Sequence, residues 1–505
     1  MNASALLASL PPPWPENLRP AIRAINAARR RHKLVVLDDD PTGTQTVHDV
    51  PVLTVWDEAT LRAEFAQPEP CFYILTNSRS LTPAAARELN LEVARNLKTV
   101  TACQPPSDVT HAPGGRHAAV SVAAPFTIVS RSDSTLRGHF PVETDALSEE
   151  LGPFDATLLI PYFEAGGRLT IDDVHYVAEG DELTPAADTP FALDAAFGYR
   201  HSNLREWVEE KTAGRIRAEA VHSISLRELR LGASTEEPTR GVTEKLLALP
   251  RGSVGVVNAA HPRDVDFFAL AALRAELAGR RFLYRTASSF VASRLGIGAA
   301  VYQPPNQPAS ASGGKSAAAP ATGGLIVVGS HVPKSTEQLN RLLATGAVMP
   351  VELPVGELLK PSRANAAIAT ARAAVETQLR AGRDAVVFTS REVLTGRDAV
   401  ESLGIAALVS EALVAIVRSL EGSPRFVIAK GGITSSDLAT KALGVERARV
   451  LGQLLPGVPV WQLGPETKFP GLDYVIFPGN VGGADGLLDA WRKCAFTLTP
   501  HCVCA

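Results

Sequence analysis

The chain has 505 residues, of which 45% are hydrophobic and 20% charged, so it has enough apolar side chains for buried cores and is too long for one ordinary domain. Its net charge of −3, from 50 basic and 53 acidic residues, argues against a nucleic-acid partner or a membrane surface bound through a basic field. No window approaches the roughly 20 apolar residues of a membrane span, and five cysteines without zinc-site spacing are typical of a reducing compartment, so we expect a cytoplasmic protein without a membrane partner.

Short apolar runs alternate with helical patterns along most of the chain. In the first part we predict strands at 34–38, 72–76, 126–130, 156–160 and 253–258, with a helix at 83–97. The stretch 303–324, QPPNQPASASGGKSAAAPATGG, has no aromatic or β-branched aliphatic residue and one charge, which predicts a flexible linker or disordered loop. In the last part we predict strands at 325–330, 384–390, 425–432 and 474–480, with helices at 363–380 and 399–420.

Continuous apolar strands between helices are typical of parallel sheets that are buried on both faces. The sequence therefore predicts an α/β protein of two doubly wound, mostly parallel-sheet domains, 1–302 and 325–495, with a cleft between them. In such sheets, ligands bind beyond the carboxyl ends of the strands. The polar and glycine residues that follow each apolar run are therefore the candidate site residues.

Three consecutive carboxylates, Asp38, Asp39 and Asp40, follow the first predicted strand in the string LDDDPTGTQTV. Neighbouring like charges raise one another's pKa, so this arrangement is costly unless a base role, a cation or hydroxyl donors offset it. An acidic turn that caps the next helix is the structural alternative, although three acids exceed what a cap needs. Asp38 and Asp40, followed by Thr42, also resemble the nucleophile loop of haloacid-dehalogenase-type phosphatases.

A second polar cluster, SRSDSTLRGHFPVE, begins at the end of the strand predicted at 126–130. Arg137 offers a planar fork suited to a carboxylate, and Asp133 can accept hydrogen bonds from sugar hydroxyls. An i,i+4 ion pair at a helix start is the alternative, which Gly138 disfavours because it weakens a helix. Strand-end positions together predict these substrate-binding residues: Asp38, Asp40, Thr42, Asn77, Arg79, Asp133, Arg137 and His139.

The stretch 161–177, PYFEAGGRLTIDDVHYV, is denser in polar side chains than a loop requires. Its candidates to line a pocket are Glu164, Arg168, Asp173 and His175, although a lone histidine is as often a structural residue with satisfied hydrogen bonds. Its Asp172 and Asp173 match a later acidic motif of the phosphatase alternative. The sequence assigns no role to the wider segment 161–215.

Glycine-rich loops follow three predicted strands of the last part, in VVGSHVPKS, AKGGITSSD and FPGNVGGADG. Glycine lets a backbone approach a phosphate closely, and helix N-termini present N–H groups to it. None of these loops is a Walker A or dinucleotide fingerprint, and each alone is weak. Three such loops at one sheet edge predict a nucleotide site.

Taken in order, LDDDPTGTQTV, SRSDSTLRG, GSHVPKS, KGGITSSD and PGNVGGADGL resemble the motifs of the four-carbon acid sugar kinase family, over about residues 35–485. The resemblance implies an ATP-dependent kinase, using Mg²⁺, that phosphorylates threonate, erythronate, an oxo-tetronate or a related acid. The first domain would bind the acid sugar and the second the nucleotide. Nucleotide contacts are implied for Ser330, Gly431, Gly432, Ile433, Thr434, Gly479 and Asn480.

The resemblance also implies catalytic roles in the first domain. Asp39 would orient or deprotonate the attacking hydroxyl, and Asp133 would assist it. The chain departs from the family pattern where Ile433 replaces the acid of the usual GGET loop, so no metal ligand is predicted there. A phosphatase that uses Asp38 and Asp40, or a sugar-acid binding protein without turnover, are the alternatives, and a homo-oligomer is compatible with the sequence.

Overall fold

The computed structural model describes residues 2–102, 125–232, 237–298, 300–304, 322–391, 394 and 399–495. The chain forms two compact units, Met1–Gly298 and Ala299–Ala505. Most of the predicted linker, residues 305–321, lies outside the described residues. The domain limits inferred from the sequence stay predictions.

The first unit is built on eight parallel strands. In order across the sheet these are β2 (Val50–Leu53), β3 (Cys71–Leu75), β1 (Lys33–Asp38), β4 (Phe126–Arg131), β11 (Phe282–Thr286), β5 (Ala156–Ile160), β10 (Ser253–Val257) and β9 (His222–Ile224). Every residue of β1 is buried, as a strand covered on both faces requires. Because the strands are parallel, their carboxyl ends meet at one edge of the sheet, which gathers the loops after β1, β3, β4 and β11.

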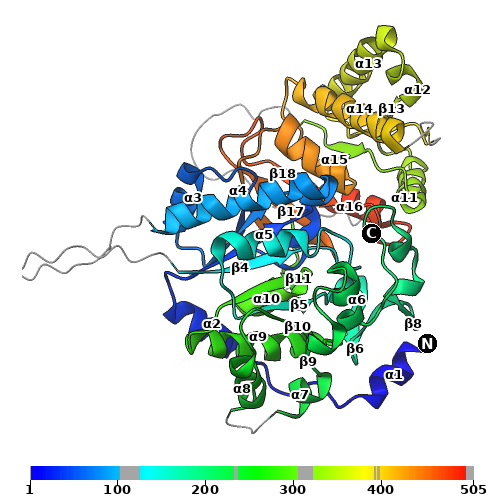
Figure 1. Cartoon of the computed structure of the whole chain (residues 1–505). Helices are drawn as coiled ribbons and strands as arrows, with labels where there is room; N and C mark the ends of the chain where they lie inside the picture. Colours follow the sequence, from blue (N-terminus) through cyan, green and yellow to red (C-terminus); the bar gives the residue numbers. More distant parts are fainter. Residues whose placement is uncertain are drawn as a thin grey trace, which may run out of the picture. The chain divides into compact units, whose positions relative to one another are not determined.

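Helices cover both faces of this sheet (Figure 1). The α-helices of the first unit are α1 (Ala3–Ser9), α2 (Arg19–Ala28), α3 (Glu58–Phe65), α4 (Pro83–Ala102), α5 (Val142–Leu151), α6 (Leu204–Lys211), α7 (Leu226–Leu231), α8 (Arg240–Ala248), α9 (Pro262–Leu277) and α10 (Ser289–Leu295). One apolar core joins α3, α4 and α5 to β1–β4, with Val35, Ile74 and Leu97 among its members. On the opposite face, α9 packs against α2, α8 and α10.

A small antiparallel sheet is inserted after β5. Its strands are β6 (Arg168–Ile171), β7 (Val174–Glu179) and β8 (Glu182–Pro185). Asp172 and Asp173 form the two-residue turn between β6 and β7, with φ of 49° and 64°, which is the backbone of a type I′ hairpin turn. This pair therefore forms a hairpin turn, and Asp173 Oδ1 also accepts hydrogen bonds from Ser223 Oγ and Asn258 Nδ2.

The second unit has a mixed sheet. In order across it lie β13 (Met349–Leu353), β14 (Ala385–Thr389), β12 (Leu325–Val328), β15 (Val427–Lys430) and β18 (Asp473–Phe477), which are parallel, then β17 (Val458–Leu463) and β16 (Arg447–Leu455), which are antiparallel. Its helices are α11 (Pro333–Leu343), α12 (Val355–Leu358), α13 (Pro361–Arg380), α14 (Ala399–Arg418), α15 (Gly432–Asp437) and α16 (Gly486–Ala495).

The predicted fold class is confirmed: both units are α/β and their sheets are mostly parallel. The sequence analysis did not foresee the β16–β17 hairpin. Along β16, buried and half-buried residues alternate, so its hydrophobic period is that of a strand with one covered face. Among the helices that the structure describes, none is both long enough and apolar enough to cross a bilayer.

Candidate functional site

Acidic and basic side chains of the first unit gather at the carboxyl ends of β1 and β4. Asp38 ends β1, and its Oδ1 accepts a hydrogen bond of 3.1 Å from Nη1 of Arg131, which ends β4. Nη2 of Arg131 donates to Ser288 Oγ at 3.1 Å. Burial raises the pKa of Asp38 to about 7, although Arg131 opposes the shift. Asp38 is therefore a carboxyl group that changes its charge near neutral pH.

Asp39 is bonded through both of its carboxylate oxygens. Arg79 donates from Nη2 to Oδ1 at 2.5 Å and from Nε to Oδ2 at 3.2 Å, while Ser132 Oγ donates to Oδ2 at 2.6 Å. Burial opposes ionisation of Asp39, but Arg79, followed by Arg131, holds its pKa below the ordinary value. Asp39 is thus an ionised carboxylate with most of its lone pairs occupied, which suits a positioning role better than proton removal.

The turn after β1 uses Asp40 as a cap. Asp40 Oδ1 accepts a 2.8 Å hydrogen bond from the backbone N–H of Thr42, at the start of the 3₁₀ helix η1 (Pro41–Thr46). Its Oδ2 lies 3.5 Å from Arg79 Nη1. A Cβ at Gly43 would overlap the Asp38 carboxylate, so the turn passes directly over that side chain. The capping alternative applies to Asp40, whereas Asp38 and Asp39 are paired with arginines.

The second predicted cluster forms an ion pair on the loop after β4. Arg137 Nε donates to Asp133 Oδ2 at 2.7 Å, and Arg137 Nη1 lies 3.6 Å from Asp194 Oδ2. Burial opposes the ionisation of Asp133, but Arg137 and then Arg79 hold its pKa well below the usual range. The backbone is not helical here, since φ is 131° at Gly138. The ion pair therefore lies on a loop, and the backbone at Gly138 is not helical, as the sequence analysis predicted.

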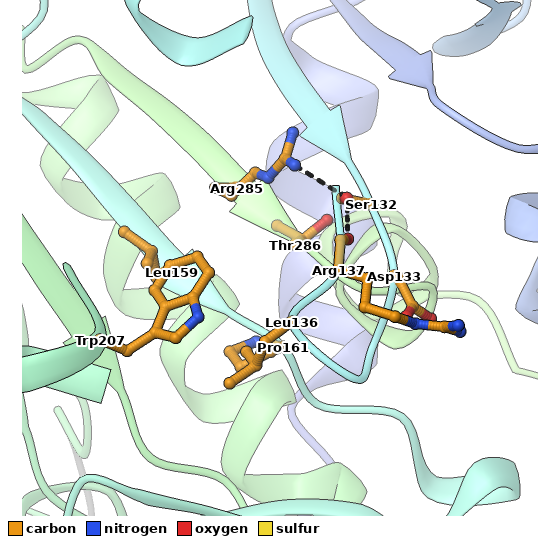
Figure 2. A pocket seen from close by; sticks show the side chains of 9 residues that line it. All are labelled: Ser132, Asp133, Leu136, Arg137, Leu159, Pro161, Trp207, Arg285 and Thr286. Carbon is orange, nitrogen blue, oxygen red and sulfur yellow. Dashed lines mark hydrogen bonds and ion pairs between the residues drawn. The ribbon is translucent and has the colours of Figure 1, made fainter. Parts of the chain in front are cut away.

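Arg285, in β11, bonds to side chains near the loops after β1 and β4. Its Nη2 donates to Ser132 Oγ at 2.8 Å (Figure 2), and its Nη1 donates to Glu143 Oε2 at 2.5 Å and Ser130 Oγ at 2.7 Å. A Cβ at Gly138 would overlap Ser132 Oγ and lie 2.9 Å from Arg285 Nη2. Glycine at 138 is therefore needed for the Asp133 loop to close over this network.

The segment 161–215 supports the Asp133 loop. His175 Nε2 is 2.8 Å from Ser134 O, and its Nδ1 is 2.9 Å from Thr170 Oγ1. Tyr199 OH donates to Thr135 O at 2.8 Å. Burial lowers the pKa of His175 to about 4, so the ring is neutral at physiological pH. His175 is a structural residue that fixes the loop backbone.

The same segment places an aromatic ring beside two arginines. The guanidinium carbons of Arg137 and Arg168 lie 5.1 and 5.3 Å from the centre of the Phe191 ring. Stacking on a ring restrains a guanidinium without using its hydrogen-bond donors. Arg137 is thus held by Asp133 and Phe191, and no described residue accepts a hydrogen bond from its Nη2.

Two other predicted residues have mainly backbone roles. Asn77 has a left-handed φ of 50° after β3, and its N–H lies 3.4 Å from Asp38 O. His139 is buried, and its Nε2 lies 3.1 Å from both Ser78 O and Leu81 O. Their substrate contacts stay predictions. The structure does bring together these predicted residues: Asp38, Asp39, Asp40, Arg79, Asp133 and Arg137.

Three strand ends of the second unit meet around Ser330. After β15, Gly431 N–H donates to Phe477 O, the end of β18, at 2.8 Å. A Cβ at Gly431 would lie 3.2 Å from Ser330 Cβ and from Thr434 Oγ1, and the φ of 121° favours glycine. A Cβ at Gly479 would lie 3.2 Å from Ser330 Oγ. The predicted loops after β12, β15 and β18 are therefore adjacent, with close backbone packing.

Further contacts fix this glycine-lined site. Ser335 Oγ, in α11, lies 3.0 Å from Ser330 Oγ and 3.1 Å from Gly479 O. Arg391 Nη1 donates to Ser330 O at 2.8 Å. Ile433, where the family pattern has an acid, is 59% exposed. Gly432, Ile433 and Asn480 lie on these loops, and their nucleotide contacts stay predictions.

A buried lysine lies beneath the glycine loops. Lys430 ends β15, and its Nζ donates to Pro478 O at 2.7 Å and Gly479 O at 3.2 Å. The same Nζ lies 3.9 Å from the centre of the Phe477 ring. Burial, and then the nearby charge of Lys334, lowers the pKa of Lys430 to about 7. Lys430 thus holds the loop after β18 from inside the fold.

Sequence reasoning missed Arg131, Arg285 and Lys430 as site residues. Each occupies a buried strand without another charged residue, in FTIVSR, FLYRT and VIAK. A charge inside a buried strand requires partners, because its transfer from water is costly otherwise. That pattern was the signal that could have identified them.

The described residues contain no group of three or more His, Cys, Asp or Glu side chains arranged to hold a metal ion. The triple-aspartate loop is instead paired with Arg79 and Arg131. The acids of this loop are therefore neutralised by arginine side chains.

Comparisons with known proteins agree with this division of the chain. Residues 34–294 match a family model described as a sugar-binding N-terminal domain, and residues 325–487 match one described as a nucleotide-binding C-terminal domain. No curated protein matches the chain. The conserved-domain descriptions assign a sugar ligand to the first unit and a nucleotide to the second.

Solved structures share the fold at low identity. A Salmonella typhimurium LT2 protein, described provisionally as a tRNA synthase, has a TM-score of 0.63 and 16% identity, covering 91% of this chain and 99% of its own. A Haemophilus influenzae protein from a family of unknown function has a TM-score of 0.57 and 17% identity, covering 90% and 98%. Both likenesses establish the two-unit α/β fold.

Proposed function

We propose that this chain, which belongs to the four-carbon acid sugar kinase family, transfers the γ-phosphoryl group of ATP to a hydroxyl of a small acid sugar such as threonate, erythronate or an oxo-tetronate. The observation that carries the proposal is the presence of a sugar-binding and a nucleotide-binding domain in one chain. A sugar ligand and a nucleotide in one enzyme are the two substrates of a sugar kinase. The paired charges of the first unit supply the preference for an acid.

In this proposal Arg137 binds the carboxylate of the acid sugar. Its Nε is bonded to Asp133, its ring-stacked guanidinium is restrained by Phe191, and its Nη2 is free of described partners. A restrained fork with a free donor suits a planar carboxylate. Asp133 is ionised and lies beside it, so it accepts hydrogen bonds from the hydroxyls of the acid sugar.

The acidic loop then positions the attacking hydroxyl. Phosphoryl transfer passes through a loose transition state and requires orientation more than a strong base. Asp39 holds Arg79 in place through two hydrogen bonds. Asp38 lies beneath the turn at Gly43 and is bonded to Arg131, so it does not meet the hydroxyl. We assign orientation to Asp39 and Asp133, and the proton to solvent.

The nucleotide is assigned to the glycine-lined site of the second unit. Gly431 and Gly479 both lie close to Ser330, and Gly431 also lies close to Thr434, so the backbones of these loops can approach a phosphate chain. Lys430 bonds the carbonyls of Pro478 and Gly479 and so acts as a positioning residue. Mg²⁺ enters with ATP and neutralises phosphate charge.

The test is an assay of ADP release with a panel of acid sugars, each with a matched neutral sugar. We expect ADP formation that depends on the acid, and a phosphorylated acid as product. Phosphate release from sugar phosphates without ATP would support a phosphatase instead, and binding without ADP formation would support a non-catalytic protein.

Two variants examine the roles of the residues. Arg137→Met should raise KM for the acid by about tenfold or more, because it removes a charge-assisted contact. Asp39→Asn should lower kcat far more than it weakens ATP binding. Arg62→Met, which changes an exposed arginine on α3, is the control and should leave both constants unchanged.

A further inference from the structure

A fourth strand end of the second unit meets the glycine-lined site. β14 pairs in parallel with β12, so the carboxyl ends of both strands lie at the same edge of the sheet. Arg391 follows β14 by two residues, and its Nη1 donates to Ser330 O at 2.8 Å. Ser330 is also the residue that Gly431 and Gly479 approach closely. Arg391 therefore brings a guanidinium to the loops to which the nucleotide is assigned.

The guanidinium of Arg391 is held in place by neutral oxygen atoms. Besides Ser330 O, it bonds twice to Thr389, from Nε to the carbonyl oxygen at 2.9 Å and from Nη2 to Oγ1 at 2.6 Å. An arginine has five N–H groups, so one on Nη1 and one on Nη2 have no acceptor among the described residues. Free donors on a fixed planar group suit the oxygens of a phosphate.

No described carboxylate balances the charge of Arg391 in an ion pair. By contrast, Arg79, Arg131 and Arg137 of the first unit are all paired with aspartates. Arg391 is half-buried, and this burial lowers its pKa, while the exposed Glu352 opposes the shift without cancelling it. Removing a cation from water is costly unless an anion accompanies it. An anionic ligand would therefore stabilise this position.

We infer that Arg391 binds a phosphate group of the nucleotide, so that this site takes a nucleotide in preference to an uncharged nucleoside. The inference rests on the proposed function, because it takes the glycine-lined site as the one that holds ATP. The alternative is that Arg391 only supports the loop at Ser330, through its bond to the carbonyl oxygen. A phosphate contact and a loop support differ in what they do to ligands without a phosphate.

Calorimetric titration of the full-length chain with ATP and with adenosine separates the two roles. Arg391→Met should weaken ATP binding by about tenfold or more, because it removes a charge-assisted contact, and should change adenosine binding by less than about twofold. Arg391→Lys keeps the charge without the planar fork, so it should recover part of the lost ATP affinity. Equal weakening of ATP and adenosine, or unchanged ATP binding, would overturn the inference.

The salt dependence of ATP binding is a second readout, which needs no adenosine. Ions screen the attraction between a guanidinium and a phosphate, so ATP affinity should fall less steeply with increasing KCl in Arg391→Met than in the unchanged chain. The control is Arg380→Met, which removes an arginine of α13 that is 64% exposed and paired with Glu421. It should alter neither ATP affinity nor its salt dependence. The same salt dependence with and without Arg391 would contradict the phosphate contact.

ATP binding in the absence of an acid sugar separates this inference from the proposed function. Suppose that ATP binding depends on Arg391 as expected, but no acid of the panel leads to ADP formation. That result would overturn the kinase proposal and retain the phosphate contact. ADP formation that depends on an acid sugar, with an ATP affinity that Arg391→Met leaves unchanged, would do the reverse.

Discussion

The buried pair of Asp38 and Arg131 allows a sharp prediction about stability. The side chains are only 2% and 5% exposed, and Arg131 also lies 3.6 Å from Asp39. At pH 8, above the pKa of Asp38, Arg131→Met would leave the buried Asp38 carboxylate without its cation. Removing one partner of a buried ion pair costs about 3–5 kcal/mol, so we expect a loss of unfolding free energy in that range.

A double variant separates the pair from simple packing loss. In Arg131→Met with Asp38→Asn, no buried charge at position 38 remains unpaired, so the loss should be smaller than in Arg131→Met alone. Arg62→Met breaks an exposed pair with Glu58, at 3.6 Å, and should cost less than about 0.5 kcal/mol.

Calorimetric unfolding of the full chain is the appropriate assay, because two units can unfold in separate transitions. The transition of the first unit should move and that of the second should not. A change below about 1 kcal/mol for Arg131→Met, or a double variant that is no more stable than the single one, would refute the reasoning.

Three further predictions concern pH and the glycine-lined site. Burial raises the folded-state pKa of Asp38 to about 7, so its contribution to the unfolding free energy is present below pH 4 and is lost as the pH rises through 7. In urea unfolding measured from pH 4 to 8, Asp38→Asn should remove this decrease of the unfolding free energy with pH. Burial lowers the folded-state pKa of Lys430 to about 7, so between about pH 7 and 10.5 the unfolded chain binds more protons than the folded chain. The unfolding free energy should therefore rise over that interval, and Lys430→Met should remove the rise. In calorimetric titration, Gly431→Ala should weaken ATP binding by about tenfold or more, because the new Cβ meets Ser330 and Thr434 at 3.2 Å. The control is Gly444→Ala, at a glycine that also has positive φ but no atom within 4 Å of the new Cβ, and it should leave ATP binding unchanged.

The sequence assigned no role to the segment 161–215, whereas its tertiary contacts show that it supports the loop after β4. Its polar residues suggested a pocket lining, and His175 was an even choice between structure and function. In the fold, His175 and Tyr199 bind the backbone of residues 134 and 135, while Phe191 restrains Arg137. The segment therefore supports the Asp133 loop.

The sequence alone determined the α/β class and the strand ends at which the residues of the proposed site lie. Apolar runs such as 34–38 and 72–76 are long enough and β-branched enough to be buried parallel strands, and parallel strands place their carboxyl ends at one edge. The strand-end positions of the acids of residues 38–40 and of Asp133 and Arg137 followed from that rule, because only local position was needed. The ion pair between Asp133 and Arg137, which the sequence analysis disfavoured, is present on a loop.

The tertiary structure alone decided which acidic side chain pairs with which arginine. Arg131 and Arg285 are far from their partners in sequence, and strand order places them beside Asp38 and Glu143. The roles within the triple-aspartate loop also depend on distance and burial: Asp40 caps a turn, Asp39 is ionised by Arg79, and Asp38 is raised in pKa by desolvation. Desolvation and Coulomb energies depend on three-dimensional surroundings, so three identical residues in a row acquire three different chemistries.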